Sequence, residues 1–281
     1  MREHSIRSFI NMKKICTILS PKDRKNVKPK GNLTGMIHSF ETFGALDGPG
    51  LRLVIFFEGC PLRCAFCHNR DMLDLKDYKK MTAKDLMKMV QDYKPYFGKK
   101  GGVTVSGGDP IYQPRFLKEF LKLCKKEKVH VAVDTSLFTS RKVIDDIFPY
   151  VDLFMVSLKH FDSETHRCLT GVPNEPILEN LDYLNEKIVK AKGREPKLWL
   201  RYMVLPGYTD TRKNVRALMD FLQDRKFELI DLLPYHVYGV YKWKQLGLKY
   251  ILKDLKPPSG KSVRKIKEKL EKEGYKVLLN E

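Results

Sequence analysis

The chain has 281 residues, of which 42% are hydrophobic, so it is long enough for one sizeable hydrophobic core and is not disordered throughout. No apolar run approaches the roughly 20 residues of a membrane-spanning helix, so we expect a soluble protein with no membrane partner. Six cysteines are too few and too clustered for a disulfide scaffold, and they favour a reducing, cytoplasmic compartment.

A formal net charge of +19 would suit a nucleic-acid binding protein if the Lys and Arg residues were clustered on one face. They are instead spread over helix-like segments at 76–88, 118–128 and 261–276, where Asp and Glu are interleaved with them. This pattern is typical of solvated helix faces, and we do not expect a nucleic-acid partner.

Residues 1–35 differ from the rest of the chain. They are rich in Lys and Arg, contain only Glu3 and Asp23 as acids, and show no periodic pattern. Their apolar run at 15–19 is too short for a secretory signal. The segment is predicted to be a disordered basic extension or an organellar presequence, followed by a single folded domain at 36–281.

Beyond residue 35, short apolar runs alternate with helical patterns. Helices are predicted at 82–97, where Thr82 and Asp85 form a weak capping box, and at 115–128. The repeated βα unit predicts parallel strands with outer helices, either as a sheet curved toward a barrel or as an open doubly wound sheet, with ligands at the carboxyl ends of the strands. Strands are predicted at 51–57, 102–106, 129–135, 151–159, 197–205 and 228–236.

The first predicted strand leads into EGCPLRCAFCHN (58–69), where Cys60, Cys64 and Cys67 have the spacing Cys-x3-Cys-x2-Cys. A glycine and a proline beside Cys60 indicate a loop that can turn the sulfurs toward one metal centre. A structural zinc would need a fourth ligand, and His68, directly after Cys67, is poorly placed to complete a tetrahedron. A 4Fe-4S cubane held by three thiolates would keep one iron open, so the spacing favours a reactive cluster.

The cysteine motif resembles that of radical S-adenosylmethionine (SAM) enzymes, in which the amino and carboxylate groups of SAM chelate the fourth iron. Other segments resemble the glycyl-radical enzyme activating enzymes, most closely their pyruvate formate-lyase activating branch. The resemblance runs from about residue 36 to the C-terminus and implies a partial (β/α)6 barrel of the radical SAM type. The segments are IHSFETFGALDGPGLR (37–52), FFEGCPLRCAFCHNRDM (56–72), GGVTVSGGDP (101–110), RYMVLPGYTD (201–210) and LLPYHVYGVYKW (232–243).

The paired glycines of SGGDP (106–110) let the backbone approach a ligand and offer carbonyl groups to an ammonium group, although they would also make a plain strand-to-helix turn. The resemblance extends this into a SAM site at several strand ends. Asp134 and Lys159 could instead form an ion pair, Phe66 could pack within its loop, and His236 could be structural. The implied site residues are Phe66, Cys67, His68, Gly107, Gly108, Asp109, Asp134, Ser157, Leu158, Lys159 and His236.

Two positions depart from the family pattern. Asp109 stands where these enzymes usually have Glu, so its carboxylate is one methylene shorter. Ser157 stands where the pyruvate formate-lyase type carries a second Asp, and with Asp134 that acid would hold a monovalent cation near the SAM carboxylate. Loss of one charged ligand predicts that a hard cation is held less tightly here.

The segment DGPGLR (47–52) lies outside the cluster, on the side where the family admits its glycyl peptide. Asp47 is assigned to hydrogen bonding with the backbone of that peptide, and Arg52 to organising the loop. Turn chemistry would explain Asp-Gly-Pro-Gly nearly as well. The remaining cysteines, Cys16, Cys124 and Cys168, lie far from the motif and are not expected to be ligands.

The resemblance implies that the chain cleaves SAM reductively and abstracts a hydrogen atom from a glycine of a partner glycyl-radical enzyme such as pyruvate formate-lyase. Flavodoxin or ferredoxin would supply the electron, and the chain would act as a monomer. No side-chain acid or base is required, because the cofactors carry the chemistry. The alternatives are another radical SAM enzyme that modifies a small molecule or tRNA, and a zinc-binding basic interaction module.

Overall fold

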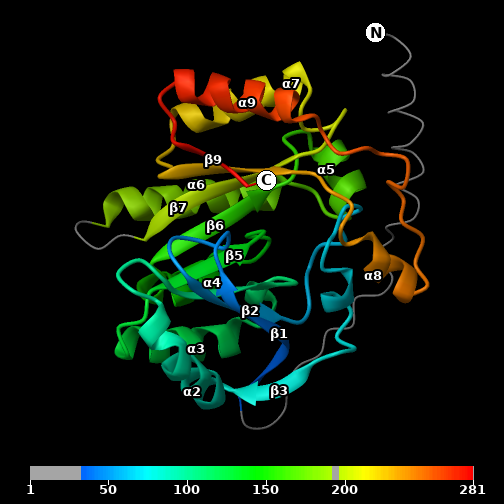
Figure 1. Cartoon of the computed structure of the whole chain (residues 1–281). Coiled ribbons are helices and arrows are strands. Elements are labelled where there is room, and N and C mark those ends of the chain that lie inside the picture. Colours follow the sequence, from blue (N-terminus) through cyan, green and yellow to red (C-terminus); the bar gives the residue numbers. More distant parts are fainter. Residues whose placement is uncertain (1–32, 192–195, 281) are drawn as a thin grey trace.

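The computed structural model describes residues 33–191 and 196–280, whose path is shown in Figure 1. The strands are β1 (Thr34–Gly44), β2 (Arg52–Phe57), β3 (Lys79–Thr82), β4 (Gly102–Gly107), β5 (Val131–Thr135), β6 (Leu153–Leu158), β7 (Lys197–Val204), β8 (Leu229–Pro234) and β9 (Val277–Leu279). The helices are α2 (Ala83–Tyr93), α3 (Pro114–Lys126), α4 (Arg141–Ile147), α5 (Ser163–Thr170), α6 (Glu175–Lys190), α7 (Arg212–Gln223), α8 (Val240–Gln245) and α9 (Gly260–Lys272). Short 3-10 helices lie at η2 (Arg70–Met72), η3 (Lys94–Tyr96), η4 (Pro110–Tyr112) and η5 (Phe148–Tyr150).

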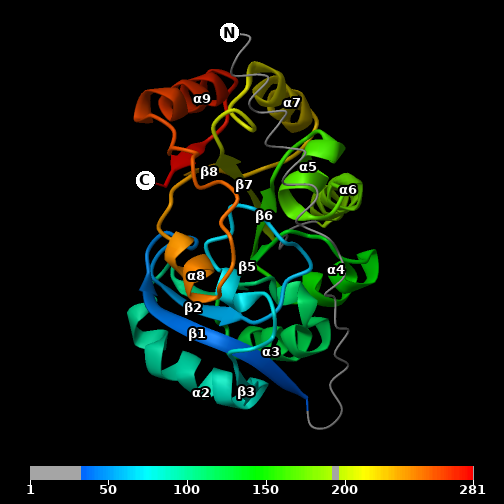
Figure 2. The same ribbon diagram turned by 90° about the vertical axis from the view of Figure 1, so that its right-hand side faces the viewer.

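The described strands form one sheet in the order β3-β1-β2-β4-β5-β6-β7-β8-β9. Neighbouring strands are parallel from β2 to β9, and β1 is antiparallel to both β2 and β3. Figure 2 shows this sheet curving, with α3, α4, α6 and α7 along its outer side and α8 across the open side. The six predicted strands correspond to β2 and β4 through β8, which confirms the partial barrel of βα units.

Strands β1, β3 and β9, at the two ends of the strand order, were not predicted. Strand β1 has polar and half-buried positions along most of its length, so it lacks the apolar run by which the central strands are detected. The predicted helix at 82–97 is α2 followed by η3, and the predicted capping box is confirmed: Thr82 Oγ1 accepts from Asp85 N–H at 3.2 Å, and Thr82 N–H donates to Asp85 Oδ2 at 3.1 Å.

Strand alternation divides the core into two layers. On β6, Phe154, Val156 and Leu158 face outward and pack with the helices, whereas Met155 and Ser157 face inward. The same period of two repeats along β5 and β7. Apolar inward residues lie near the amino ends of the strands, and polar inward residues lie toward the carboxyl ends, where the parallel strands open into a cavity.

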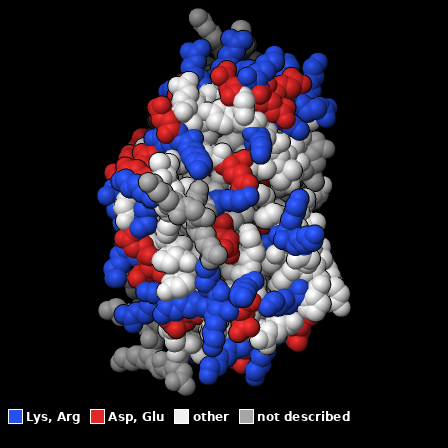
Figure 3. Space-filling model, turned by 90° about the vertical axis from the view of Figure 1, so that its left-hand side faces the viewer, with Lys and Arg blue, Asp and Glu red and all other residues white. Residues whose placement is uncertain are grey.

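The surface carries many basic side chains, and acids lie among them. Figure 3 shows Lys and Arg interleaved with Asp and Glu over one face. Examples of ion pairs are Lys118 with Asp146 and Lys187 with Asp145, each at 2.7 Å. No helix in the described ranges is long and apolar enough to cross a membrane. The predicted basic extension falls almost wholly outside the described residues, and β1 begins at Thr34.

Candidate SAM and iron–sulfur site

A cavity of about 580 Å³ lies at the carboxyl ends of the parallel strands. The sequence predicted that ligands bind at this edge of the sheet. Each strand from β4 to β8 contributes a residue at or near its end, and the loop after β2 contributes the cysteines. The predicted residues that line it are Asp47, Cys60, Cys64, Phe66, Cys67, His68, Gly107, Gly108, Asp109, Asp134, Ser157, Lys159 and His236.

The cysteine loop is fixed from two sides by backbone hydrogen bonds. Gly59, with a φ of 93° that favours glycine, donates to the carbonyl of Met72 at 2.7 Å. Farther along, Ala65 donates to the carbonyl of Leu169 at 2.8 Å, at the end of α5. From α8, the indole N–H of Trp243 donates to the carbonyl of Cys67 at 2.8 Å. The loop conformation is therefore set by elements far away in the sequence.

The three thiols suit a polynuclear cluster better than a single ion. Burial raises the pKa of all three, that of Cys67 to about 12, so the thiols are protonated at neutral pH unless a metal replaces the proton. No three His, Cys, Asp or Glu side chains in the described residues are arranged to hold one metal ion. In a cubane each thiolate binds a different iron, so convergence on one point is not required. The donor set and its enclosure fit a 4Fe-4S cluster.

The glycine pair after β4 presses against the cysteine loop. Gly107 has a φ of 109°, and a Cβ there would lie 2.5 Å from the backbone N and O of Phe57. A Cβ on Gly108 would lie 2.3 Å from the carbonyl oxygen of Gly59. Both glycines line the cavity, so this turn meets the packing requirement and also leaves room for a ligand. The two interpretations of SGGDP are compatible.

Asp109 lies at the end of this turn and is almost fully buried. Its carboxylate accepts hydrogen bonds from the hydroxyl groups of Thr135 and Ser136 at 2.8 and 2.6 Å. It also caps η4 by accepting from Ile111 N–H at 3.3 Å. Burial raises the pKa of Asp109 to about 6, against the lowering effect of the bonds from Ser136 and Thr135.

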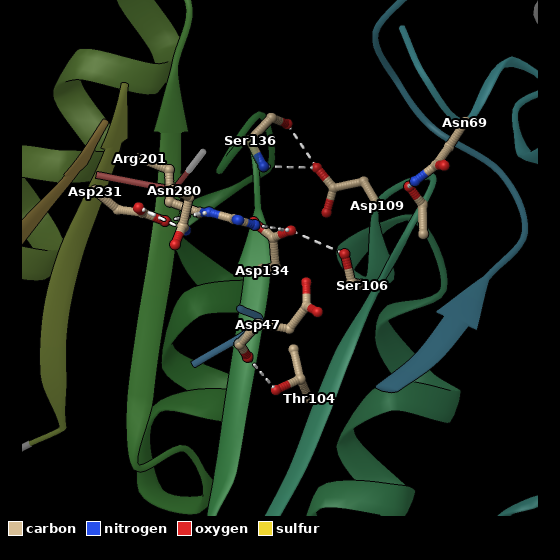
Figure 4. A network of polar contacts seen from close by, with 11 residues as sticks. Asp47, Asn69, Thr104, Ser106, Asp109, Asp134, Ser136, Arg201, Asp231 and Asn280 are labelled. Atoms are coloured by element: carbon tan, nitrogen blue, oxygen red, sulfur yellow. Dashed lines mark hydrogen bonds and ion pairs between the residues drawn. The ribbon is translucent and has the colours of Figure 1, made fainter. Parts of the chain in front are cut away.

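Asp134 and Arg201 lie on the inner wall of the cavity (Figure 4). The guanidinium of Arg201 contacts Asp134 Oδ2 at 2.9 Å and Asp231 Oδ2 at 3.0 Å. Ser106 Oγ also donates to Asp134 Oδ2 at 2.8 Å. Asp134 therefore has an ion-pair partner, but it is Arg201 and not the Lys159 considered from the sequence. Ser157, on the strand between Asp134 and Arg201, adds no charge.

Two histidines stack beside the cysteine loop. The rings of His68 and His236 lie 3.7 Å apart with an interplanar angle of 23°, and His236 also contacts the ring of Tyr238 at 4.6 Å. Burial, followed by the neighbouring His236, lowers the pKa of His68 to about 4, and burial lowers that of His236, so both rings are neutral at pH 7. Phe66 is buried in a cluster with Tyr235 and Trp243 and also lines the cavity.

The DGPGLR loop (residues 47–52) packs against β4 and contributes Asp47 to the cavity lining. Arg52 is fully buried and donates to the carbonyl of Pro49 at 3.3 Å and to Thr104 Oγ1 at 2.9 Å. Thr104 Oγ1 in turn donates to the carbonyl of Asp47 at 2.6 Å. The side chain of Asp47 lines the cavity, and burial raises its pKa. Arg52 is therefore hydrogen-bonded within the loop and does not line the cavity, and its proposed role in organising the loop stays a prediction.

Leu158, like Arg52, is a predicted site residue that the structure separates from the cavity. Its side chain is fully buried in the outer core between the sheet and the helices. The reason is strand alternation, because Ser157 faces inward and its neighbour must face outward. The structure therefore does not bring the Leu158 side chain to the cavity. Cys124, in α3, is also buried in the outer core and does not line the cavity.

Comparison with known proteins places this geometry in a family. A family model described as the radical SAM superfamily matches residues 54–222. The pyruvate formate-lyase 1-activating enzyme of Escherichia coli strain K12 is 41% identical over 251 residues, which cover 88% of this chain and 99% of that protein. The chain belongs to the pyruvate formate-lyase activating enzymes of the radical SAM superfamily.

Solved structures agree with the fold of this activating enzyme. A domain of pyruvate-formate lyase-activating enzyme from Bacteroides vulgatus has a TM-score of 0.53 and 29% identity, covering 64% of this chain and 99% of that one. Streptococcus suis SuiB bound to S-adenosylmethionine has a TM-score of 0.63 at 18% identity, covering 87% of this chain and 52% of that one. The second likeness concerns the fold alone.

Several residues of the activating enzyme's site were missed by the sequence reasoning. The half-buried Arg201 and the buried Asp231 are charged residues inside the apolar runs KLWLRYMVL and ELIDLLPYH, and a charge in such a run is a signal that was available. Asn280, which donates to Asp231 Oδ1 at 2.8 Å, comes from the chain terminus and carried no signal. Ser136 and Tyr238 also line the cavity.

Proposed function

We propose that this activating enzyme cleaves SAM reductively and abstracts a hydrogen atom from a glycine of pyruvate formate-lyase, generating a glycyl radical. The observation that carries the proposal is that the three cysteines, the glycine turn and the strand-end polar residues line a single cavity. Membership of the pyruvate formate-lyase activating enzymes supports the reaction and the class of partner.

The chain's own residues bind and orient the reactants. When bound, the cluster and SAM would supply the electron transfer and the deoxyadenosyl radical that takes the hydrogen atom. Cys60, Cys64 and Cys67 would hold the cluster, and the backbone around Gly108 would offer carbonyl groups to the ammonium of SAM. Asp47 would accept a hydrogen bond from the backbone of the substrate peptide. The walls of the cavity would limit the side reactions of such a radical with other hydrogen donors.

A monovalent cation near the SAM carboxylate is a further proposal taken from the family. In this chain Asp134 would be its only acidic ligand, because Ser157 replaces the second Asp. One oxygen of Asp134 already accepts from Arg201 and Ser106, so a cation would compete with a fixed positive charge. We therefore propose a weakly held cation.

The cavity opens toward exposed apolar side chains, which supports a macromolecular substrate. Leu46 and Tyr238 line the cavity and are 55% and 79% exposed. Exposed apolar side chains beside a site mark a surface for a partner.

We further propose that the protein acts as a cytoplasmic monomer and takes its electron from flavodoxin or ferredoxin. Family resemblance supports the proposed localisation, the monomeric state and the electron donor.

The deciding experiment is anaerobic reconstitution of the full-length protein with iron and sulfide, followed by electron paramagnetic resonance with SAM and pyruvate formate-lyase. We expect a cluster signal that SAM perturbs and, after reduction, a glycyl radical on the lyase. SAM cleavage without a glycyl radical would favour a radical SAM enzyme acting on a small molecule or tRNA. Zinc without iron and no SAM cleavage would favour the zinc module and refute the proposal.

A further inference from the structure

The carboxylate of Asp109 is fully occupied by hydrogen bonds within the protein. Its Oδ1 accepts from Thr135 Oγ1 at 2.8 Å and from Ile111 N–H at 3.3 Å. Its Oδ2 accepts from both the N–H and the hydroxyl of Ser136, at 2.9 and 2.6 Å. The residue is only 1% exposed. Because a carboxylate offers about four acceptor positions, a bound ammonium group would have to displace one of these donors in a buried place.

Asp109 also connects two loops that border the cavity. Its backbone N–H donates to the carbonyl of Gly59 at 2.9 Å, at the start of the cysteine loop. Its side chain reaches in the other direction to Thr135 and Ser136, at the end of β5. One residue therefore sets the distance between the cysteine loop and the β5–α4 loop (residues 136–140).

The β5–α4 loop is one that needs such a restraint. Leu137 has a φ of 60°, a left-handed conformation that is unfavourable for a bulky side chain. Its N–H donates to Thr135 Oγ1 at 2.9 Å, the same hydroxyl that donates to Asp109. From the other side, Asn180 donates to the carbonyls of Leu137 and Thr139 at 3.0 and 2.7 Å. Strained backbone persists only where the surroundings hold it in place.

We propose that Asp109 is a positioning residue that fixes the β5–α4 loop against the cysteine loop, and that it does not bind SAM directly. The inference deepens the proposed function, since it concerns the same SAM site. A Glu at this position would carry its carboxylate one methylene farther and could not keep all four bonds. With Asp in place of the Glu of related enzymes, the carboxylate holds the loop instead of the ligand, and SAM would contact the glycine turn.

The first test compares SAM with an analogue of SAM that lacks the α-amino group, using the full-length protein carrying its cluster. Asp109→Asn and Ser136→Ala are each expected to weaken both ligands by the same factor, roughly tenfold, which corresponds to about 1.4 kcal/mol. The double variant should bind SAM no more weakly than the weaker-binding single variant, because both changes break the same contact between Asp109 and Ser136. If Asp109→Asn weakened SAM but not the analogue, a direct contact with the ammonium would be established and the proposal overturned.

The second test needs no SAM. Before ligand is added, each single variant should lower the midpoint of thermal unfolding by about 3–10 °C. The midpoint of the double variant should be no lower than that of the less stable single variant. Additive shifts, or none, would contradict the proposal. Thr135→Val, which replaces the hydroxyl that bonds Asp109 and Leu137 with a methyl group, takes the place of Asp109→Asn in both tests if that variant does not fold. Asp85→Asn, at the exposed cap of α2, is the control: it should lower the midpoint without changing either affinity.

The two proposals can fail separately. If the affinities and midpoints behave as expected but no glycyl radical forms on pyruvate formate-lyase, the proposed function fails and the role of Asp109 stands. If the radical forms and Asp109→Asn is selective against SAM, the proposed function stands and the role of Asp109 falls.

Discussion

At the scale of single residues, the cavity wall carries opposite charges that lie together in buried or half-buried positions. Arg201 lies between Asp134 and Asp231, and the negative charge of Asp47 contributes to the raised pKa of Asp231. Removing one member of such a group leaves an uncompensated buried charge, which is far costlier than losing a surface ion pair. The electrostatics of the site thus depend on Arg201 as much as on the acids recognised from the sequence.

Ser157→Asp tests the effect of the missing acid. The new carboxylate would stand on β6, the strand between those of Asp134 and Arg201, and would give the proposed cation a second acidic ligand. We expect the affinity for SAM to become dependent on the monovalent cation, with roughly a tenfold difference between potassium and sodium, equivalent to about 1.4 kcal/mol. The unmodified protein should show little difference. Equal affinities in the two salts for Ser157→Asp would contradict our account of this position.

The pH dependence of stability tests the burial of Asp231. Burial raises its pKa from 3.8 to about 6, although Arg201 opposes the rise. Between these two pH values the folded state binds a proton that the unfolded state has lost, so stability falls as pH rises from about 4 to 6. Asp231→Asn should remove this contribution, which is on the order of 3 kcal/mol. Urea midpoints across this pH range, compared with those of the exposed control Asp254→Asn, would reveal it; parallel curves would refute it.

At the scale of elements, the glycine turn after β4 and the cysteine loop after β2 form one unit. Gly108 donates to the carbonyl of Phe57 at 2.8 Å, and Asp109 donates to that of Gly59 at 2.9 Å. Parallel pairing of β2 with β4 brings the two turns together. The cluster-binding loop is therefore shaped by the neighbouring strand, and a change in the glycine turn should be felt at the cysteines.

Gly108→Ala tests this coupling. Its Cβ would lie 2.3 Å from the carbonyl oxygen of Gly59, so one of the two turns must move. We expect a loss of stability of about 1–3 kcal/mol and a clear fall in iron bound per chain after reconstitution. Gly207→Ala is the control, because it has a positive φ but nothing within 4 Å of the added Cβ. Full iron content in Gly108→Ala would mean that the turns are not coupled.

At the scale of the whole molecule, the open side of the barrel is where a partner can approach. The segment before and within α8 exposes Val237, Tyr238 and Tyr241, of which Tyr238 also lines the cavity. Trp243 of the same helix is buried against the cysteine loop. Helix α8 therefore links the surface to the site, and its exposed aromatic residues are suited to anchor a protein substrate.

Tyr241→Ser tests this approach surface. Tyr241 is 57% exposed and does not line the cavity, so its loss should raise the KM for pyruvate formate-lyase, by roughly tenfold if it is an anchor, without lowering the affinity for SAM. Tyr96→Ser, at a residue 58% exposed beside Phe43 and Tyr93, is the matched control. An equal effect of both variants on KM would show that this part of α8 is not used.

The sequence by itself determined the features that are local. The cysteine spacing, the glycine pair and the apolar strands are each written in a few consecutive residues, and from them the barrel, the cluster ligands and the ligand edge were predicted. Period-two alternation would also have excluded Leu158 had it been applied strictly at the end of β6.

Only the tertiary structure decided which polar groups meet. Arg201 pairs with Asp134 across 67 positions of sequence, and Asp109 meets Thr135 across 26. These partners come together because parallel strands bring their carboxyl ends to one edge, and the order and register of strands are set by non-local pairing. The sequence therefore indicated Asp109 and Asp134 as site residues. The fold determined that Asp109 is hydrogen-bonded to the β5–α4 loop and that Asp134 pairs with the guanidinium of Arg201, which also contacts Asp231.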